Sequence, residues 1–162
     1  MKKFLVIGNP IQHSLSPKLQ NYWLNKNNVK AIYGKLETHE NDLEDLCSNL
    51  RDGKLDGLNV TVPFKQKIIE YLDVLSGHAL RTKSVNTVSV QDGNLIGHNT
   101  DIDGFELSMK KLNYDVAGKS IMILGAGGVV PSIVYALKRM KVSKIYLSNR
   151  TKEKAVKLKN SF

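Results

Sequence analysis

Apolar and polar positions follow two alternating patterns along the first part of the chain. Short apolar runs typical of buried strands occupy residues 3–8, 31–36 and 57–62. Apolar residues at helical spacing follow each run, from Ser16 onward and over 40–50 and 64–72. Strands that alternate with helices in this way predict an α/β sheet.

A β-hairpin is predicted next. Two strand-like runs, 84–90 and 94–98, flank the dipeptide Asp92-Gly93, which favours a tight turn between antiparallel strands. The sheet is therefore expected to be mixed. A helix is predicted over 101–112, where Phe105, Met109 and Leu112 are spaced to face a core. We expect the first domain to cover residues 1–112.

A second strand and helix pattern begins after this boundary. The apolar run 120–124 leads into a glycine-rich turn, a helix predicted to end near residue 140, and a further strand at 144–147. This βαβ order is the start of a doubly wound dinucleotide-binding fold, which needs about six strands. We expect residues 113–162 to form the N-terminal part of a Rossmann-type domain that is incomplete in this chain.

Composition is that of a folded protein and limits its partners. Hydrophobic residues make up 41% of the chain and charged residues 24%, as in ordinary globular domains. The net charge of +9 favours nucleic acid or a smaller anionic ligand. The cations are scattered until the C-terminal stretch, and no recognisable nucleic-acid-binding motif accompanies them. We therefore expect no nucleic-acid partner.

Cys47 is the only cysteine, which excludes an internal disulfide and is typical of a reducing cytosol. It shares one predicted helix face with three leucines, so a core position is expected. The N-terminal apolar run is shorter than the roughly 7–15 residues of a signal peptide core. The longest nearly apolar run, 121–130, is far below the ~18 residues of a membrane span. We expect a cytoplasmic protein without a membrane segment.

The first candidate site lies in the loop after the first strand. Ser16 precedes Pro17, an arrangement that favours an N-cap followed by proline in the first helical turn. Ser14 has no such duty, and two hydroxyls beside a helix N-terminus would also suit a carboxylate or phosphate. Both interpretations of Ser16 stay open. His13 has no partner at metal-ligand spacing, so a metal is not expected.

The second candidate site follows the third strand. Asn59 and Thr61 alternate with apolar residues, so we expect them on one face of the strand and the valines on the other. Lys65 falls where a helix is predicted to begin, although a helix N-terminus disfavours cations. An exception of this kind is more frequent at functional sites, while a solvated lysine on a half-exposed strand is the alternative. Lys67 is the weaker candidate.

The third candidate site combines Asn86 with Asp101. Asp101 could simply stabilise a helix N-terminus, and Thr100 with Asp103 resembles a capping box. Capping does not explain why Asn-Thr pairs occur at two separate strand ends. Asparagine and threonine offer directed donors and acceptors, which suits a polyhydroxylated ligand.

The fourth candidate site is the stretch LGAGGVVPS. Gly125, Gly127 and Gly128 follow a predicted strand and open a helix, where they permit a tight turn close to a pyrophosphate. Val130 stands where a third small residue is usual. The second strand ends in Ser148-Asn149-Arg150-Thr151 rather than in an acid. A cation and a hydroxyl there indicate a 2′-phosphate and hence NADP, and a basic surface turn is the alternative.

Six motifs, in this order, resemble those of the shikimate dehydrogenase family: NPIQHSLSP, NVTVPFK, SVNT, HNTDIDG, GAGG and NRTKEKA. The resemblance implies a substrate domain, an NADP domain, and reversible NADPH-dependent reduction of 3-dehydroshikimate to shikimate by a monomer or homodimer. It implies Lys65 and Asp101 as catalytic residues. The substrate set would be Ser14, Ser16, Asn59, Thr61, Lys65, Asn86 and Asp101. The cofactor set would be Gly125, Ala126, Gly127, Gly128, Val129, Asn149, Arg150, Thr151 and Lys154.

The chain departs from the family pattern at a few positions. Gln20 stands where histidine is usual, and Thr82-Lys83-Ser84 replaces an apolar-Gly-Ala sequence. If the backbone at that glycine has positive φ, Lys83 would cost about 1 kcal/mol. The family's chain is also longer, so we expect this chain alone to be inactive. The alternatives are a shikimate-binding module without catalysis and, with less support, a basic nucleic-acid-binding protein.

Overall fold

The computed structural model describes all residues from 1 to 162 and divides them into two compact units, Met1–Asn99 and Thr100–Phe162. The helices and strands of the first unit are β1 (Lys2–Gly8), α1 (Ser16–Lys26), β2 (Ala31–Glu37), the 3₁₀ helix η1 (Glu40–Asp42), α2 (Leu43–Arg51), β3 (Gly57–Val60), the 3₁₀ helix η2 (Lys67–Tyr71), β4 (Val74–Leu75), α3 (Gly77–Thr82), β5 (Thr87–Gln91) and β6 (Asn94–His98).

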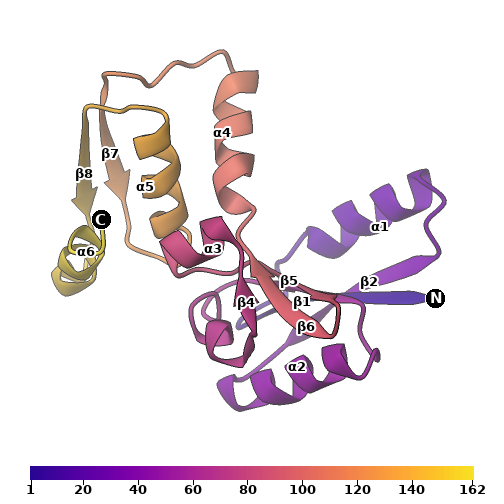
Figure 1. Ribbon diagram of the computed structural model, residues 1–162. Helices are drawn as coiled ribbons and strands as arrows, with labels where there is room; N and C mark the ends of the chain where they lie inside the picture. Colours follow the sequence, from indigo (N-terminus) through magenta and orange to yellow (C-terminus); the bar gives the residue numbers. More distant parts are fainter. The chain divides into compact units, whose positions relative to one another are not determined.

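The first unit is built on a six-stranded mixed sheet in the order β2-β1-β3-β5-β6-β4. Strand β1 pairs in parallel with β2 and β3, and β5 pairs antiparallel with β3 and β6. Helices α1 and α2 lie on opposite sides of this sheet (Figure 1). The mixed α/β sheet predicted from the sequence is therefore confirmed.

Apolar residues form two cores, one on each face of the sheet. The larger core joins the leucines of α2 and Cys47 to Ile7, Leu58 and Val60. The smaller core contains Val6, Ile11 and Tyr33. Cys47 is 3% exposed and burial raises its thiol pKa to about 11, so its predicted core position is confirmed.

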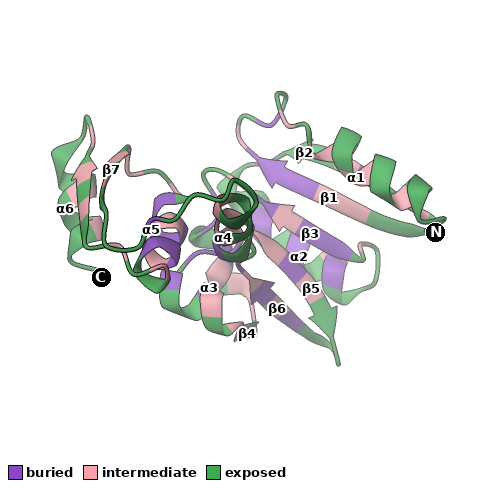
Figure 2. Ribbon diagram, turned by 90° about the horizontal axis from the view of Figure 1, so that it is seen from above, coloured by how far each residue is buried: buried purple, intermediate pink, exposed green.

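Helix α1 differs from α2 in how it meets the sheet. None of its residues is buried, and Leu19, Tyr22 and Trp23 are 55%, 57% and 47% exposed. Figure 2 shows the contrast, with purple on α2 and only pink and green on α1. The apolar stripe of α1 is therefore largely at the surface of this chain.

The second unit contains α4 (Asp101–Lys111), β7 (Ser120–Leu124), α5 (Val130–Arg139), β8 (Lys144–Ser148) and α6 (Lys152–Lys159). Strands β7 and β8 form a parallel pair, with Ser120 opposite Lys144 and Leu124 opposite Ser148. The predicted βαβ unit is present. Helix α4 packs against α5, and Arg139 contacts Glu106 across this pair, with 3.1 Å between Nε and Oε1.

The compact units and the predicted domains divide the chain at different places. The structure divides it after Asn99, whereas the sequence indicates 112/113. The difference is helix α4, which the structure groups with α5. Leu112, which was expected to face a core, lies just beyond the helix and is 70% exposed; Ile102 is the fully buried residue of α4.

The predicted helix over 64–72 is wrong in its first half. Strand β3 ends at Val60, residues 62–66 form turns, and only Lys67–Tyr71 are helical, as a 3₁₀ helix. Pro63 has no backbone N–H, which prevents it from continuing the sheet ladder. Val62 is 54% exposed and does not fill the core beside Val60 as expected. Strand β4 and helix α3 were not predicted.

No helix of the protein is long and apolar enough to cross a membrane.

Lys83 has a backbone conformation with positive φ, which is costly for a residue other than glycine. It ends α3 in the left-handed region, with φ 47° and ψ 44°. We expect Lys83→Gly to raise the free energy of unfolding by about 1 kcal/mol, because glycine has no Cβ to clash there. Lys83→Ala is the matched control, since it removes the same charge but keeps the Cβ. Equal stability of the two variants in chemical denaturation would contradict the explanation.

Asp73 joins α2 to the hairpin strand β6 and should make stability depend on acid pH. Arg51 donates hydrogen bonds of 2.8 and 3.0 Å to its carboxylate, and the Leu95 N–H donates another of 2.7 Å. The Arg51 hydrogen bonds, followed by that of Leu95, lower the pKa of Asp73 below its usual 3.8. This contribution to stability is therefore present above pH 3.8 and is lost as the pH falls through the lower folded-state pKa.

Asp73→Asn should therefore flatten the fall of the unfolding free energy at pH values below 3.8. Chemical denaturation at a series of acid pH values measures this slope. Asp52→Asn is the control, because its carboxylate contacts exposed Lys54 at 2.8 Å on the surface. The same slope in wild type and Asp73→Asn would show that the carboxylate does not stabilise the fold.

Candidate functional site

Several polar segments meet at one edge of the first unit's sheet. Parallel strands β1 and β3 both end there, at Gly8 and Val60. Strand β5 runs the other way and begins at this edge, since Thr87 is the partner of Asn59. The loops at 9–15, 61–66 and 83–86 therefore lie at the carboxyl ends of the parallel strands, where open α/β sheets bind ligands.

Ser14, rather than Ser16, accepts a hydrogen bond at the start of α1. The Ser14 Oγ accepts a hydrogen bond of 3.3 Å from the Ser16 N–H, and the Ser14 N–H donates one to the Ile11 carbonyl. Ser16 is the first residue of α1 and its side chain makes no cap. The capping interpretation of Ser16 is thus wrong. Both hydroxyls belong to half-exposed residues beside the first turn of α1.

The loop that carries Ser14 is tied to strand β2 and its end. Gln12 Nε2 donates to Glu37 Oε2 at 3.2 Å, and Lys35 Nζ donates to the Gln12 carbonyl at 2.6 Å. The Asn9 side chain donates to the Thr38 carbonyl at 3.3 Å. These contacts reduce the freedom of the loop before any ligand binds.

Thr61 lies against the end of strand β1. Its N–H donates to the Ile7 carbonyl at 2.9 Å, and a Cβ built on Gly8 would come within 2.6 Å of the Thr61 Cγ2. Only glycine leaves that space, because real Cβ atoms do not approach a methyl group so closely. Gly8 therefore lets the segment after β3 pass directly beside the end of β1.

Lys65 is held in the turn region and is 8% exposed. Its carbonyl accepts a hydrogen bond of 2.8 Å from the Val85 N–H, which connects the segment after β3 to the residue before Asn86. The expected helix N-terminus at Lys65 is absent, so the argument from a helix dipole does not apply. Lys67 instead pairs with Glu40 on the surface.

Asn59 and Asn86 are joined by hydrogen bonds. The Asn59 amide donates to the Asn86 carbonyl at 3.1 Å and to the Thr87 Oγ1 at 2.9 Å. Tyr33 Oη donates to the Asn59 Oδ1 at 2.6 Å. Asn59 points to the face opposite Leu58 and Val60, as predicted from the alternation.

Tyr33 was not identified from the sequence. It lies on strand β2, which is separated in sequence from the other site motifs, and only the pairing of β2 with β1 brings it near Asn59. An aromatic residue in an apolar run carries no signal of a polar role.

Asp101 belongs to the second unit, as the first residue of α4. Thr100 is the residue before the helix, and its side chain makes no cap. The predicted capping box of Thr100 and Asp103 is therefore absent. Asp101 and Asp103 both lie in the first turn, where carboxylates favour the positive end of the helix.

The glycine-rich turn of the second unit links β7 to α5. Gly125 has φ +119°, which requires glycine, and its N–H donates to the Ser148 carbonyl at 2.7 Å. The Ala126 N–H donates to the Asn149 Oδ1 at 3.1 Å, and the Asn149 amide donates to the Thr151 carbonyl at 2.7 Å. Asn149 thus joins the glycine-rich turn to the turn that follows β8.

The remaining cofactor candidates leave room for an anion. Nothing lies within 4 Å of a Cβ built on Gly127 or on Gly128. Arg150, Thr151 and Lys154 are exposed at the end of β8 and the start of α6. Val130, where a small residue is usual, is 7% exposed and packs as part of the buried face of α5. Open space beside these two glycines, together with the exposed cations, fits a phosphorylated ligand.

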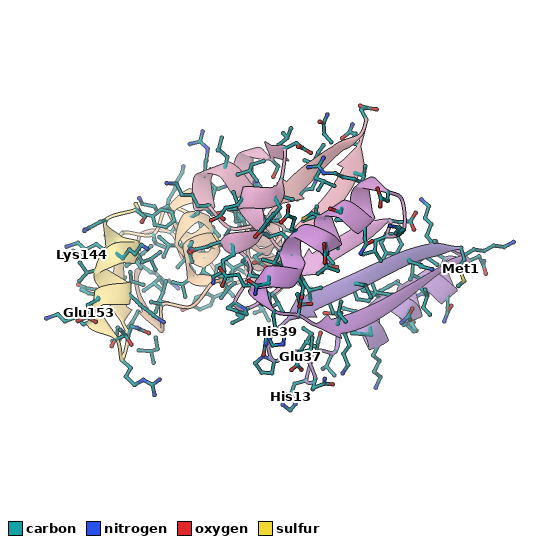
Figure 3. All side chains as sticks on the ribbon, turned by 90° about the horizontal axis from the view of Figure 1, so that it is seen from below. Met1, His13, Glu37, His39, Lys144 and Glu153 are labelled. Atoms are coloured by element: carbon teal, nitrogen blue, oxygen red, sulfur yellow. The ribbon has the colours of Figure 1, made fainter.

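Histidines His13 and His39 lie with Glu37 at one end of the first unit (Figure 3). Their side chains do not form a group of three ligands that could hold a metal ion, and no other such group occurs in the chain. The Gln12 contact already engages the Glu37 carboxylate.

Comparison with known proteins identifies both parts of the chain. Residues 6–88 match the model of the shikimate dehydrogenase substrate binding domain, and residues 106–162 match that of shikimate / quinate 5-dehydrogenase. Shikimate dehydrogenase (NADP(+)) of Pelagibacter ubique is 55% identical over 99% of this chain and 61% of its own length. The corresponding protein of Aquifex aeolicus is 43% identical over 97% of this chain and 58% of its own length.

Solved structures agree with these matches. The Aquifex aeolicus shikimate dehydrogenase crystal structure has a TM-score of 0.93 at 41% identity and is matched over 100% of this chain and 60% of its own. The Thermus thermophilus enzyme, solved in complex with NADP(H) and shikimate, has a TM-score of 0.89 at 32% identity, with 99% and 60% covered. The chain thus spans about three fifths of the length of these relatives. It belongs to the shikimate dehydrogenase family.

Proposed function

We propose that the protein catalyses the reversible NADPH-dependent reduction of 3-dehydroshikimate to shikimate. The observation that carries this proposal is the position of Lys65, a lysine 8% exposed at the ligand-binding edge of the sheet and attached through its backbone to the residue before Asn86. The family membership and the Thermus thermophilus complex with shikimate and NADP(H) support it.

On the substrate side, we assign Ser14 and Ser16 to the carboxylate, since both lie beside the first turn of α1. Thr61, Asn86 and Asp101 are assigned to the hydroxyls. Thr61 and Asn86 come from loops at the same sheet edge as Lys65. Asp101 follows shortly after His98, the last residue of β6, which pairs with Thr87 at that edge.

Lys65 would act on the oxygen of the reacting carbonyl group. Reduction of the ketone adds a hydride to carbon and leaves negative charge on oxygen, which then takes a proton. An ammonium group shielded from water stabilises that charge more strongly than a solvated one and can donate the proton. Asp101 would be the second catalytic residue, as the resemblance of the HNTDIDG motif implies. In the reverse direction, the Lys65 amine accepts the proton from the shikimate hydroxyl.

On the cofactor side, bound NADPH would supply the hydride. We assign its pyrophosphate to the backbone of residues 125–129, where the space beside Gly127 and Gly128 is open. Arg150, Thr151 and Lys154 would hold the 2′-phosphate, since cations and a hydroxyl replace the acid of an NAD site. Asn149 would set the shape of both segments through its two hydrogen bonds.

We also infer a cytoplasmic protein, monomeric or homodimeric, that binds no nucleic acid. Its one thiol is buried, as suits a reducing compartment. Several cations of the basic C-terminal stretch already have partners: Arg139 contacts Glu106, and Lys138 donates to the Phe162 carbonyl at 2.8 Å. These contacts weaken the case for a nucleic-acid surface.

Lys65→Ala tests the proposed chemistry. We expect kcat to fall by about 100-fold, as is typical for loss of an acid-base group, with a smaller change in KM. Turnover is measured on a hybrid that continues past Phe162 with the remainder of the Pelagibacter ubique relative, and shikimate binding is measured on the chain itself. Lys67→Ala is the control, since Lys67 pairs with Glu40 on the surface.

Two results would contradict the proposal. An unchanged kcat in Lys65→Ala would remove Lys65 from the chemistry. Shikimate binding by the wild-type hybrid without any turnover would favour the alternative, a binding module without catalysis.

Arg150→Ala tests the choice of cofactor. We expect NADP⁺ binding to weaken by about tenfold or more, because a charge-assisted contact to the 2′-phosphate is lost, while NAD⁺ binding stays nearly constant. Calorimetry with both nucleotides measures the difference. Lys144→Ala removes a cation from the opposite end of strand β8 and should affect neither nucleotide. Equal losses for NADP⁺ and NAD⁺ in Arg150→Ala would remove the assignment to the 2′-phosphate.

A further inference from the structure

Four side chains form a continuous hydrogen-bonded chain across the first unit's sheet. Tyr33 on β2 contacts Asn59 on β3, Asn59 contacts Thr87 on β5, and Thr87 contacts the neighbouring Asn86. The three distances are 2.6, 2.9 and 3.0 Å. The chain therefore connects a strand near one side of the sheet with the loop residue proposed to bind substrate.

The hydrogen bonds run in one direction along these four side chains. Tyr33 Oη donates to Asn59 Oδ1, so the Asn59 amino group is turned toward β5. Its two hydrogens go to the Asn86 carbonyl and to the Thr87 Oγ1. The Thr87 hydroxyl, having accepted from Asn59, donates its only hydrogen to the Asn86 Oδ1 at 3.0 Å.

Asn59 consequently has no amide hydrogen left to give to a ligand. An asparagine side chain carries two N–H donors, and both are used between strands β3 and β5. Its carbonyl oxygen already accepts from Tyr33. Asn59 therefore cannot donate a hydrogen bond to substrate while these contacts are made.

Both ends of this hydrogen-bonded series, Tyr33 and Asn86, are held in place. Tyr33 is 6% exposed in the smaller core, and its burial raises the pKa of the phenol to about 12, so it remains a donor at physiological pH. The Asn86 backbone is held as well, because its N–H donates to the His98 carbonyl at 3.0 Å and its carbonyl accepts from the Val60 N–H at 2.9 Å.

We propose that Tyr33, Asn59 and Thr87 are positioning residues that fix the orientation of the Asn86 side-chain amide. With Asn86 Oδ1 accepting from Thr87, the amino group lies on the other side of the amide. Asn86 then recognises a substrate hydroxyl by donating to its oxygen. The role of Asn86 as a substrate contact rests on the proposed function; the orientation of its amide rests on the hydrogen bonds alone.

Thr87→Val tests this inference because valine keeps the shape of threonine and removes the hydroxyl. We expect shikimate affinity to fall by about tenfold, the size that loss of one orienting hydrogen bond produces. Thr87→Ser keeps the hydroxyl and should restore affinity. Ser89→Ala is the matched control: it removes a hydrogen bond to His98 from the same strand without touching Asn86. Calorimetry on the chain measures all four proteins.

A double-mutant cycle separates positioning from general loss of structure. If Thr87 acts through Asn86, adding Thr87→Val to Asn86→Ala should weaken shikimate binding no further. Additive losses, or an affinity of Thr87→Val equal to that of wild type, would overturn the inference. Tyr33→Phe provides a second variant at the other end of the chain, with the same expected coupling to Asn86→Ala.

A measurement without ligand keeps the inference distinct from the proposed function. The side-chain amide signals of Asn86 in ¹H–¹⁵N NMR spectra should shift in Thr87→Val and in Tyr33→Phe, but stay in place in Ser89→Ala. Unchanged Asn86 signals would reject the positioning chain whatever the binding result. Failure of the wild-type protein to bind shikimate would instead reject the proposed function. Shifted Asn86 amide signals would still support the hydrogen-bonded series from Tyr33 to Asn86.

Discussion

The hydrogen bond from the Val85 N–H to the Lys65 carbonyl is the contact on which the candidate site depends. It joins the NVTVPFK motif, which follows β3, to the SVNT motif, which precedes β5. Because this bond is made by the Lys65 carbonyl, it fixes the position of the Lys65 backbone and does not involve the side-chain amine. The opposed directions of β3 and β5 make this possible, since one strand ends where the other begins.

The sequence was sufficient for most strands of the fold because their apolar runs are short and bounded by Gly, Pro or Asn. It was less reliable where tertiary contacts decide local structure. The segment after Pro63 has helical periodicity, yet it forms turns before η2, and the Lys65 carbonyl accepts from the Val85 N–H rather than from a residue of its own segment. A period in the sequence describes which residues face a core, and turns can satisfy it as well as a helix.

In the candidate site, too, some features follow from the sequence and others from tertiary contacts. Lys65 was proposed because a cation is disfavoured at a predicted helix N-terminus, and Thr61 and Asn86 because polar residues occur at two strand ends. The helix N-terminus at Lys65 is absent, so that prediction was wrong. Tyr33 could not be identified, because its role arises from the strand order, which places β2 and β3 on either side of β1. The roles of Ser14 and Ser16 at the start of α1 were reversed, since spacing alone does not determine which of two nearby hydroxyls meets a backbone N–H. The positive φ of Lys83, by contrast, was correctly expected from the family resemblance, in which glycine is usual at this position.

Asn149 has a consequence for how cofactor preference can change in this fold. Its side chain accepts from the Ala126 N–H in the glycine-rich turn and donates to the Thr151 carbonyl in the turn after β8. One side chain therefore holds both turns. An aspartate introduced at residue 149 to favour NAD would still accept from the Ala126 N–H, but it could not donate to the Thr151 carbonyl, so the turn after β8 would be released. A change of preference toward the other nucleotide is therefore expected at the neighbouring residue 150. The charge there can change without loss of the Asn149 hydrogen bonds.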